Sequence, residues 1–126
     1  MTKKEIAAMI DHTLLAPNVA STKIEQLCKE AIQYGFASVC VNPIFVSLAA
    51  SLLSGTDVKV CSLIGFPLGA ITTEEKISET INAVKDGADE IDMVMNLNAA
   101  IDGRFTAVGS DIAGVVGAAK TIGKLQ

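Results

Sequence analysis

The chain lacks the features that mark zinc sites, nucleic-acid surfaces and linkers between domains. Its single histidine and three cysteines do not have metal-ligand spacing, which excludes a zinc site. Lys3 and Lys4 are the only adjacent basic residues, and the formal charge of -4 argues against a nucleic-acid surface or a basic membrane-binding face. No stretch has the composition of a linker. We therefore expect residues 1–126 to form a single domain.

A long stretch, residues 31–56, lacks charge altogether. It nevertheless does not predict a membrane span, because it contains Gly35, Pro43 and five Ser or Thr residues, and its pattern changes from strand-like to helix-like at Pro43. The N-terminal residues 1–5 lead into only a short apolar segment, without the apolar region of a signal peptide. These observations favour a cytoplasmic protein without a membrane partner.

What the chain does have is an alternation of strand and helix signals that repeats every 25 to 30 residues or so, roughly the length of a βα unit. Strands are expected at residues 9–13, 37–42, 58–64 and 90–95, and helices at residues 22–34, 43–54, 72–86 and 105–120. Glycines close the first three helices, and three further glycines weaken the fourth. The pattern predicts four βα units.

Capping and packing signals support the helices. Thr22 with Glu25 and Thr72 with Glu75 have the spacing of capping boxes. Apolar residues recur at helical spacing in the first two helices, which predicts that one stripe of each faces the core. These residues are Ile24, Leu27, Cys28 and Ala31 in the first helix, and Val46, Ala49, Ala50 and Leu53 in the second.

Parallel strands joined through helices are compatible with two folds. One is a doubly wound open sheet, and the other is part of a closed TIM barrel. Side-chain alternation places Ser38, Cys40 and Asn42 on one face of the second strand, and Asp92 and Asn96 on one face of the fourth. Polar residues gathered on one face toward the strand ends suit a barrel interior near its catalytic mouth. We favour parallel βα units of a TIM barrel, truncated to a half-barrel.

Asp92 is the most informative single residue, because it interrupts an apolar run at residues 91–95 that suits a strand buried on both faces. An ionised carboxylate is costly to bury, so Asp92 is expected to face a cation, in a structural salt bridge or in a catalytic site. Polar or loop-forming residues also follow the other strands, where α/β enzymes bind ligands. They are Asp11, His12 and Thr13, Asn42, and Gly65 with Phe66.

Four segments, in this order, closely resemble deoxyribose-phosphate aldolase: IDHTLL (10–15), SVCVNP (38–43), IGFPLG (64–69) and GADEIDMV (87–94). The resemblance extends over residues 8–120. It implies a TIM-barrel lyase that reversibly cleaves 2-deoxy-D-ribose 5-phosphate to D-glyceraldehyde 3-phosphate and acetaldehyde. In this family a lysine forms a Schiff base with the aldehyde, and the resemblance implies neither a metal nor another cofactor.

The resemblance also implies roles for individual residues. Asp92 matches the family's strand-four aspartate, which acts with water in proton transfer around the reactive lysines. Asp11 and Thr13 match residues that position water and the sugar hydroxyls. Cys40 and Asn42 are implied to line the same mouth, and Phe66 to form an apolar wall.

Other interpretations of these residues stay open on the sequence alone. Asp11 and Thr13 could instead cap the first loop through local hydrogen bonds to the backbone. Cys40 could be a catalytic thiol, but buried cysteines commonly act as small hydrophobic residues. His12 is expected to be a hydrogen-bonded structural residue, since no nucleophile lies beside it in the sequence.

The chain departs from the family in length and in its lysines, because a βα barrel needs roughly 200 residues or more. The family's Schiff-base lysine, second lysine and phosphate site belong to later strands and match no position here. Lys59 opens the third strand at the wrong end, and the remaining lysines beyond Lys4 are expected on helices or their ends: Lys23, Lys29, Lys76, Lys85, Lys120 and Lys124. Residues 121–126 stand where the fifth strand is expected.

A half-barrel would expose its inner face and two sheet edges, which predicts a homo-oligomer or a separate C-terminal half that completes the barrel. Three hypotheses follow. The chain is the N-terminal half of an aldolase acting on a sugar phosphate and an aldehyde, inactive without the missing lysines. Alternatively, it is a non-enzymatic, self-associating remnant or interaction module. A third hypothesis is an unrelated open-sheet domain that binds a small ligand.

Overall fold

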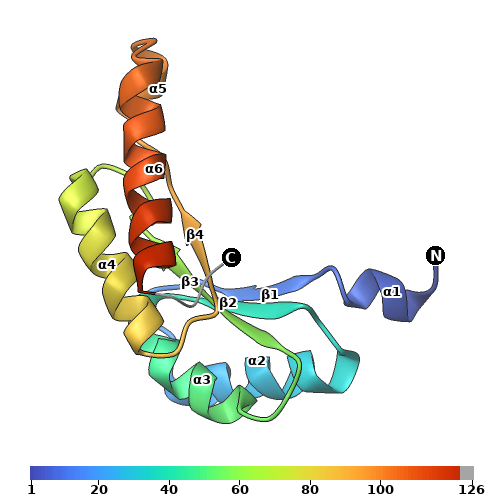
Figure 1. Ribbon diagram of the computed structural model, residues 1–126. Helices are drawn as coiled ribbons and strands as arrows, with labels where there is room; N and C mark the ends of the chain where they lie inside the picture. The colour runs from blue at the N-terminus through green and yellow to red at the C-terminus, as the bar shows by residue number, and fades with distance from the viewer. Residues whose placement is uncertain (123–126) are drawn as a thin grey trace.

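The computed structural model describes residues 1–122 and contains one parallel sheet with helices between its strands (Figure 1). The strands are β1 (Asp11–Leu14), β2 (Ser38–Val41), β3 (Lys59–Ile64) and β4 (Glu90–Met93). The helices are α1 (Lys3–Ala7), α2 (Ser21–Tyr34), α3 (Val46–Leu53), α4 (Thr73–Lys85), α5 (Leu97–Ile101) and α6 (Phe105–Thr121). A 3₁₀ turn, η1 (Pro43–Phe45), precedes α3. Each strand lies within two residues of its predicted limits.

The order of the strands decides between the two predicted folds. The strands pair in parallel in the order β1-β2-β3-β4, which is also their order along the chain. A doubly wound sheet reverses its strand order at a switch point, whereas a βα barrel adds each strand to the same edge. The prediction of TIM-barrel βα units is therefore confirmed. In Figure 1, α2 and α3 pack along one side of the sheet, and α4 lies beside α6.

The main core lies between the sheet and its helices. Val39, Val41, Val60 and Ile64 project from β2 and β3 toward this side. The predicted stripe of α2 is confirmed, because Ile24, Leu27, Cys28 and Ala31 are its buried residues. In α3, Val46, Ala49 and Leu53 are buried as predicted, whereas Ala50 is only partly buried against the same core.

Helix α2 begins differently from the prediction. The capping box at Thr22 is wrong: the helix starts at Ser21, and its N-cap, Ala20, offers no side-chain hydrogen bond. Gly35 ends it in the left-handed conformation (φ 68°), as its residue type predicts. In α4, by contrast, the predicted capping box forms, since Thr72 Oγ1 accepts from the Glu75 amide at 3.1 Å and Glu75 reaches back to the Thr72 amide.

Three features were not expected from the sequence. Pro43 opens the 3₁₀ turn η1, so α3 starts only at Val46. The short helices α1 and α5 were not predicted. Helix α1 buries none of its residues and projects from the rest of the described chain (Figure 1).

Helices α4 and α6 are joined by a buried ion pair. Lys76 Nζ lies 2.6 Å from Asp111 Oδ2, and both side chains are withdrawn from solvent. Gly114 follows one turn later on α6, where a Cβ would lie 2.9 Å from Thr73 Cγ2. The two helices therefore approach closely. Within residues 1–122, no helix is both long enough and apolar enough to cross a membrane.

Candidate functional site

The strand register brings the predicted site residues onto one face of the sheet. We call the face opposite α2 and α3 the inner face. It carries Asp11, Thr13, Ser38, Cys40, Lys59, Cys61, Leu63, Glu90 and Asp92. One row crosses all four strands, because Thr13 is the register partner of Cys40, Cys40 of Cys61, and Cys61 of Glu90. The next row, toward the carboxyl ends, pairs Leu63 with Asp92.

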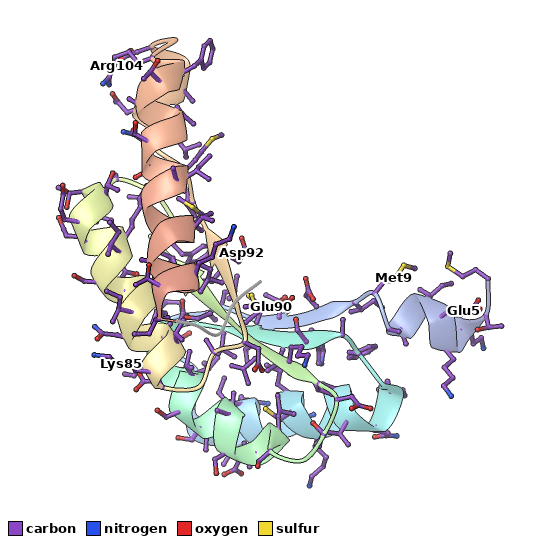
Figure 2. The ribbon with its side chains drawn as sticks, in the orientation of Figure 1. Glu5, Met9, Lys85, Glu90, Asp92 and Arg104 are labelled. Atoms are coloured by element: carbon purple, nitrogen blue, oxygen red, sulfur yellow. The ribbon has the colours of Figure 1, made fainter. Side chains whose placement is uncertain are left out.

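Asp92 lies on this inner face but is exposed, so the expectation of a strand buried on both faces is wrong. In the described residues, helices cover only the opposite face, where Ile91 and Met93 are partly buried. Figure 2 shows Glu90 and Asp92 on the open side of β4. Neither a salt bridge nor a hydrogen bond to the Asp92 carboxylate is found within residues 1–122. Among these residues, the Asp92 carboxylate therefore faces solvent and not the expected cation.

Asp11 and Thr13 lie within the edge strand β1. The expectation that Asp11 follows this strand is wrong, because Asp11 is the first residue of β1 and pairs with Ser38, the first residue of β2. Ser38 Oγ donates to Asp11 Oδ1 at 2.6 Å, which fixes the carboxylate against the neighbouring strand. Thr13 Oγ1 donates to the backbone oxygen of Asp11 at 2.8 Å, a local contact of the kind expected for a loop cap. The Asp11 side chain thus makes a contact between strands, and Thr13 a local one.

Asn42 directly follows β2 and connects the first two strand ends. Its Nδ2 donates to the backbone oxygen of Leu15 at 3.1 Å. This hydrogen bond holds the segment after β1 beside the end of β2. Asn42 is therefore structurally engaged at the carboxyl edge, where the sequence predicts a binding residue.

Cys40 and Cys61 are buried together on the inner face, with Leu63 and Leu15 packed against them. The neighbouring Cys61 side chain lowers the pKa of Cys40, although burial and the carboxylates of Asp92, Asp11 and Glu90 act in the opposite direction. The interaction with Cys40, together with burial, raises the pKa of Cys61. Sequence reasoning singled out Cys40 but missed Cys61, which the alternation of β3 places on the same face.

Phe66 projects from the loop between β3 and α4 and is exposed, at 43% of its reference area. The loop itself is held on two sides. The Gly65 amide donates to Glu79 Oε1 at 3.2 Å, and a Cβ on Gly69 would lie 2.2 Å from the Met95 backbone oxygen. The backbone around Phe66 is therefore fixed between α4 and the segment after β4.

His12 lies outside the candidate site. Its ring points to the helix-covered face, where Nε2 lies 3.0 Å from Glu30 Oε1 and the ring centroid is 5.0 Å from that of Phe36. The structure thus agrees with the prediction of a hydrogen-bonded structural histidine.

The lysines lie away from the carboxyl ends of the strands. Lys59 opens β3, as expected, and Lys23, Lys29, Lys76, Lys85 and Lys120 lie on helices. Lys124 and the rest of residues 123–126 lie outside the described residues. Sequence reasoning missed the buried pair of Lys76 with Asp111, because a lysine in a helix gives no sign of which neighbouring helix covers it. Among residues 1–122, no lysine follows the end of a strand.

Comparison with known proteins gives consistent results. The model of the DeoC/LacD family of aldolases matches residues 6–123. The deoxyribose-phosphate aldolase of Thermoanaerobacter sp. (strain X514) is 56% identical over 120 residues, which cover 95% of this chain and 54% of that protein. The corresponding aldolase of Geobacillus sp. (strain WCH70) is 58% identical over 118 residues, covering 94% and 53%.

Solved structures show the same similarity. A putative deoxyribose-phosphate aldolase from Coccidioides immitis superposes with a TM-score of 0.92 at 45% identity, covering 95% of this chain and 47% of that one. The tetrameric deoxyribose phosphate aldolase from Aeropyrum pernix superposes with a TM-score of 0.88 at 33% identity, covering 98% and 52%. The chain spans about half the length of the curated relatives it matches.

Proposed function

Because the chain belongs to the DeoC/LacD family of aldolases, we propose that it forms the N-terminal half of a deoxyribose-phosphate aldolase barrel, as one domain. The reaction is the reversible cleavage of 2-deoxy-D-ribose 5-phosphate to D-glyceraldehyde 3-phosphate and acetaldehyde through a lysine Schiff base. The lysine comes from βα units beyond those described. The cytoplasm, as the proposed location, suits three cysteines that are all free.

The placement of Asp92 carries this proposal. It is an exposed carboxylate in the last inner-face row of β3 and β4, next to their carboxyl ends, where TIM-barrel enzymes hold their reacting groups. A carboxylate there can accept and return a proton beside an amine supplied from across the barrel. The amine would also provide the cation that Asp92 lacks within residues 1–122.

The other inner-face residues are assigned supporting roles. Asp11, held by Ser38, and Thr13 are proposed to bind water and sugar hydroxyls at the β1 edge. Cys40 and Asn42 line the same mouth, and the exposed ring of Phe66 provides an apolar wall for the substrate. Neither a metal nor another cofactor has a role in this mechanism.

A chimera tests the proposed role of Asp92. This chain is fused in frame to the half of the Thermoanaerobacter relative that it does not span, and acetaldehyde release from 2-deoxyribose 5-phosphate is followed. Asp92→Asn should lower kcat by about 100-fold or more, the size expected for loss of a proton-transfer group. The matched control is Glu90→Gln, which removes an exposed carboxylate two residues earlier on the same face. Equal activity of the Asp92→Asn and parent chimeras would contradict the assignment.

The chain alone is expected to form no Schiff base. Borohydride reduction in the presence of acetaldehyde, followed by peptide mass spectrometry, should find no site-specific lysine adduct on the chain and one adduct on the relative's half of the chimera. An adduct at a single lysine of the isolated chain would show that it carries its own reactive amine.

A second candidate function is a self-associating half-barrel without catalysis. Within residues 1–122, the outer edges of β1 and β4 are unpaired and no helix covers the inner face, and both features favour it. Because the inner face carries three carboxylates, Asp11, Glu90 and Asp92, and one lysine, Lys59, it is acidic on balance. Two such faces would repel each other, so we propose pairing through the strand edges. Light scattering coupled to size-exclusion chromatography should show a homo-oligomer at micromolar concentration whose mass does not depend on salt. A stable monomer would exclude this alternative.

A further inference from the structure

The three cysteines occupy two different environments. Cys40 and Cys61 are register partners on the adjacent strands β2 and β3, with both side chains on the inner face. They are 3% and 6% exposed, so their sulfur atoms lie just below the open surface. Cys28 lies on the other side of the sheet, within the stripe of α2 that packs into the main core. The chain therefore contains one thiol pair and one isolated thiol.

The spacing of the pair permits a disulfide. Neighbouring strands lie about 4.8 Å apart, and disulfides join residues whose Cα atoms are about 4.4 to 6.8 Å apart. The Cβ atoms must approach to about 3.8 Å, roughly 1 Å closer than the strand spacing. A bond formed here would hold some strain. Strained disulfides are reduced more readily than unstrained ones, which suits a bond that forms and breaks reversibly.

The two thiols also differ in reactivity. The thiolate is the form that reacts with oxidants, and the neighbouring Cys61 side chain lowers the pKa of Cys40. Cys61 retains its proton because the same interaction raises its pKa. Three carboxylates face the pair, those of Asp92, Asp11 and Glu90, and they oppose ionisation without reversing the direction at Cys40. Cys40 is thus the first nucleophile, and Cys61 is placed to resolve its oxidised form.

We propose that Cys40 and Cys61 form a site of reversible oxidation, at which hydrogen peroxide converts the two thiols into a disulfide across β2 and β3. The Cys40 sulfur attacks one peroxide oxygen, the O–O bond breaks, and a sulfenic acid and one water form. The Cys61 sulfur then attacks the sulfenic sulfur, the S–O bond breaks, and its thiol proton leaves with the hydroxide as a second water. The two thiols are oxidised by two electrons, and the peroxide is reduced to water.

The site does not depend on aldolase activity, because it needs only residues of this chain. Its position also matters for the inner face. The row of Cys40 and Cys61 is next to the inner-face row that contains Asp92. A bond that draws β2 and β3 together would therefore change the sheet one row away from that carboxylate.

Peroxide treatment of the folded chain tests the proposal. The chain is incubated with hydrogen peroxide, its remaining thiols are blocked with N-ethylmaleimide under denaturing conditions, and peptides are analysed by mass spectrometry. We expect a Cys40–Cys61 cross-link, a mass lower by two hydrogen atoms, one blocked thiol at Cys28, and full reversal by dithiothreitol. Modification of Cys28 should be at least about tenfold slower than loss of the pair.

Matched variants separate the pair from the isolated thiol. Cys28→Ala should retain the cross-link, whereas Cys40→Ala and Cys61→Ala should abolish it, and circular dichroism checks that each variant is folded. In Cys61→Ala, Cys40 should progress to sulfinic acid, because no resolving thiol remains. The proposal is overturned if the parent chain gives a sulfinic acid at Cys40 without a cross-link, or a disulfide that involves Cys28 or a second copy of the chain.

Discussion

Lys76 Nζ lies 2.6 Å from Asp111 Oδ2, and this ion pair is enclosed between α4 and α6. Thr73 Oγ1 donates to the other carboxylate oxygen of Asp111 at 2.8 Å. The Lys76 stem also lies close to the loop before α4, because a Cβ on Gly65 would lie 3.2 Å from Lys76 Cε. One charged side chain thus connects the last long helix of the described chain to the loop that carries Phe66.

Removing one member of this pair should be strongly destabilising. Asp111→Leu leaves the Lys76 ammonium buried without its partner, which we expect to lower the free energy of unfolding by about 3 to 5 kcal/mol. The double variant Lys76→Met/Asp111→Leu removes both charges and should recover most of that loss. Urea denaturation followed by circular dichroism measures both. A double variant as unstable as the single one would show that packing, and not charge, dominates here.

Gly69 and Gly35 provide a matched pair of glycine substitutions. Both have a left-handed backbone, with φ of 66° and 68°, but a Cβ on Gly69 would lie 2.2 Å from the Met95 backbone oxygen, whereas one on Gly35 would meet nothing within 4 Å. Gly35→Ala should cost about 1 to 2 kcal/mol of stability from backbone strain alone. Gly69→Ala should cost roughly 3 kcal/mol or more, because the backbone that follows β4 must also move. Similar losses in chemical denaturation would contradict the close approach.

Thr72 and Thr22 provide a second matched pair. Thr72→Ala removes the side chain that accepts from the Glu75 amide, and should cost about 1 kcal/mol of stability. Thr22 is exposed inside the first turn of α2 and caps no amide, so Thr22→Ala should change stability by less than about 0.5 kcal/mol. Thermal unfolding of the two variants checks the difference. A loss of stability in Thr22→Ala as large as that in Thr72→Ala would support the capping box that the sequence predicts at Thr22.

Cys28 should make stability depend on pH in the alkaline range. Burial raises the pKa of its thiol from 9.0 to about 11, so the folded chain favours the protonated form. The resulting contribution to stability is complete below pH 9, and it is lost as the pH rises through about 11, because ionisation then favours the unfolded chain. The stability difference between the parent chain and Cys28→Ala should therefore decrease from pH 8 to about pH 11. A constant difference would contradict this account.

Periodicity and turn chemistry were sufficient to predict the strands, the principal helices and the barrel-type βα units. The stripe of α2 was predictable because Ile24, Leu27, Cys28 and Ala31 repeat at helical spacing, which needs no tertiary information. Thr22 misled the prediction since its spacing to Glu25 is that of a capping box. The helix nevertheless begins one residue earlier, at Ser21.

The candidate site was predictable in position but not in environment. Alternation along β2 and β4 correctly indicated that Cys40 and Asp92 share a face. It could not indicate that Asp92 is exposed, because burial of a strand depends on what covers each face and not on the strand itself. The pair of Lys76 and Asp111 was invisible for a related reason, as its members are separated by 35 positions and meet only when α6 packs on α4.

The order of the sheet also has a consequence for synthesis on the ribosome. Since every strand pairs with the strand made just before it, the sheet can assemble progressively as the nascent chain emerges, at about 5 to 20 residues per second. No strand has to wait for a distant partner, so the described part of the chain can gain its structure co-translationally. Once β4 has paired with β3, the outer edge of β4 is the position at which a further strand can pair.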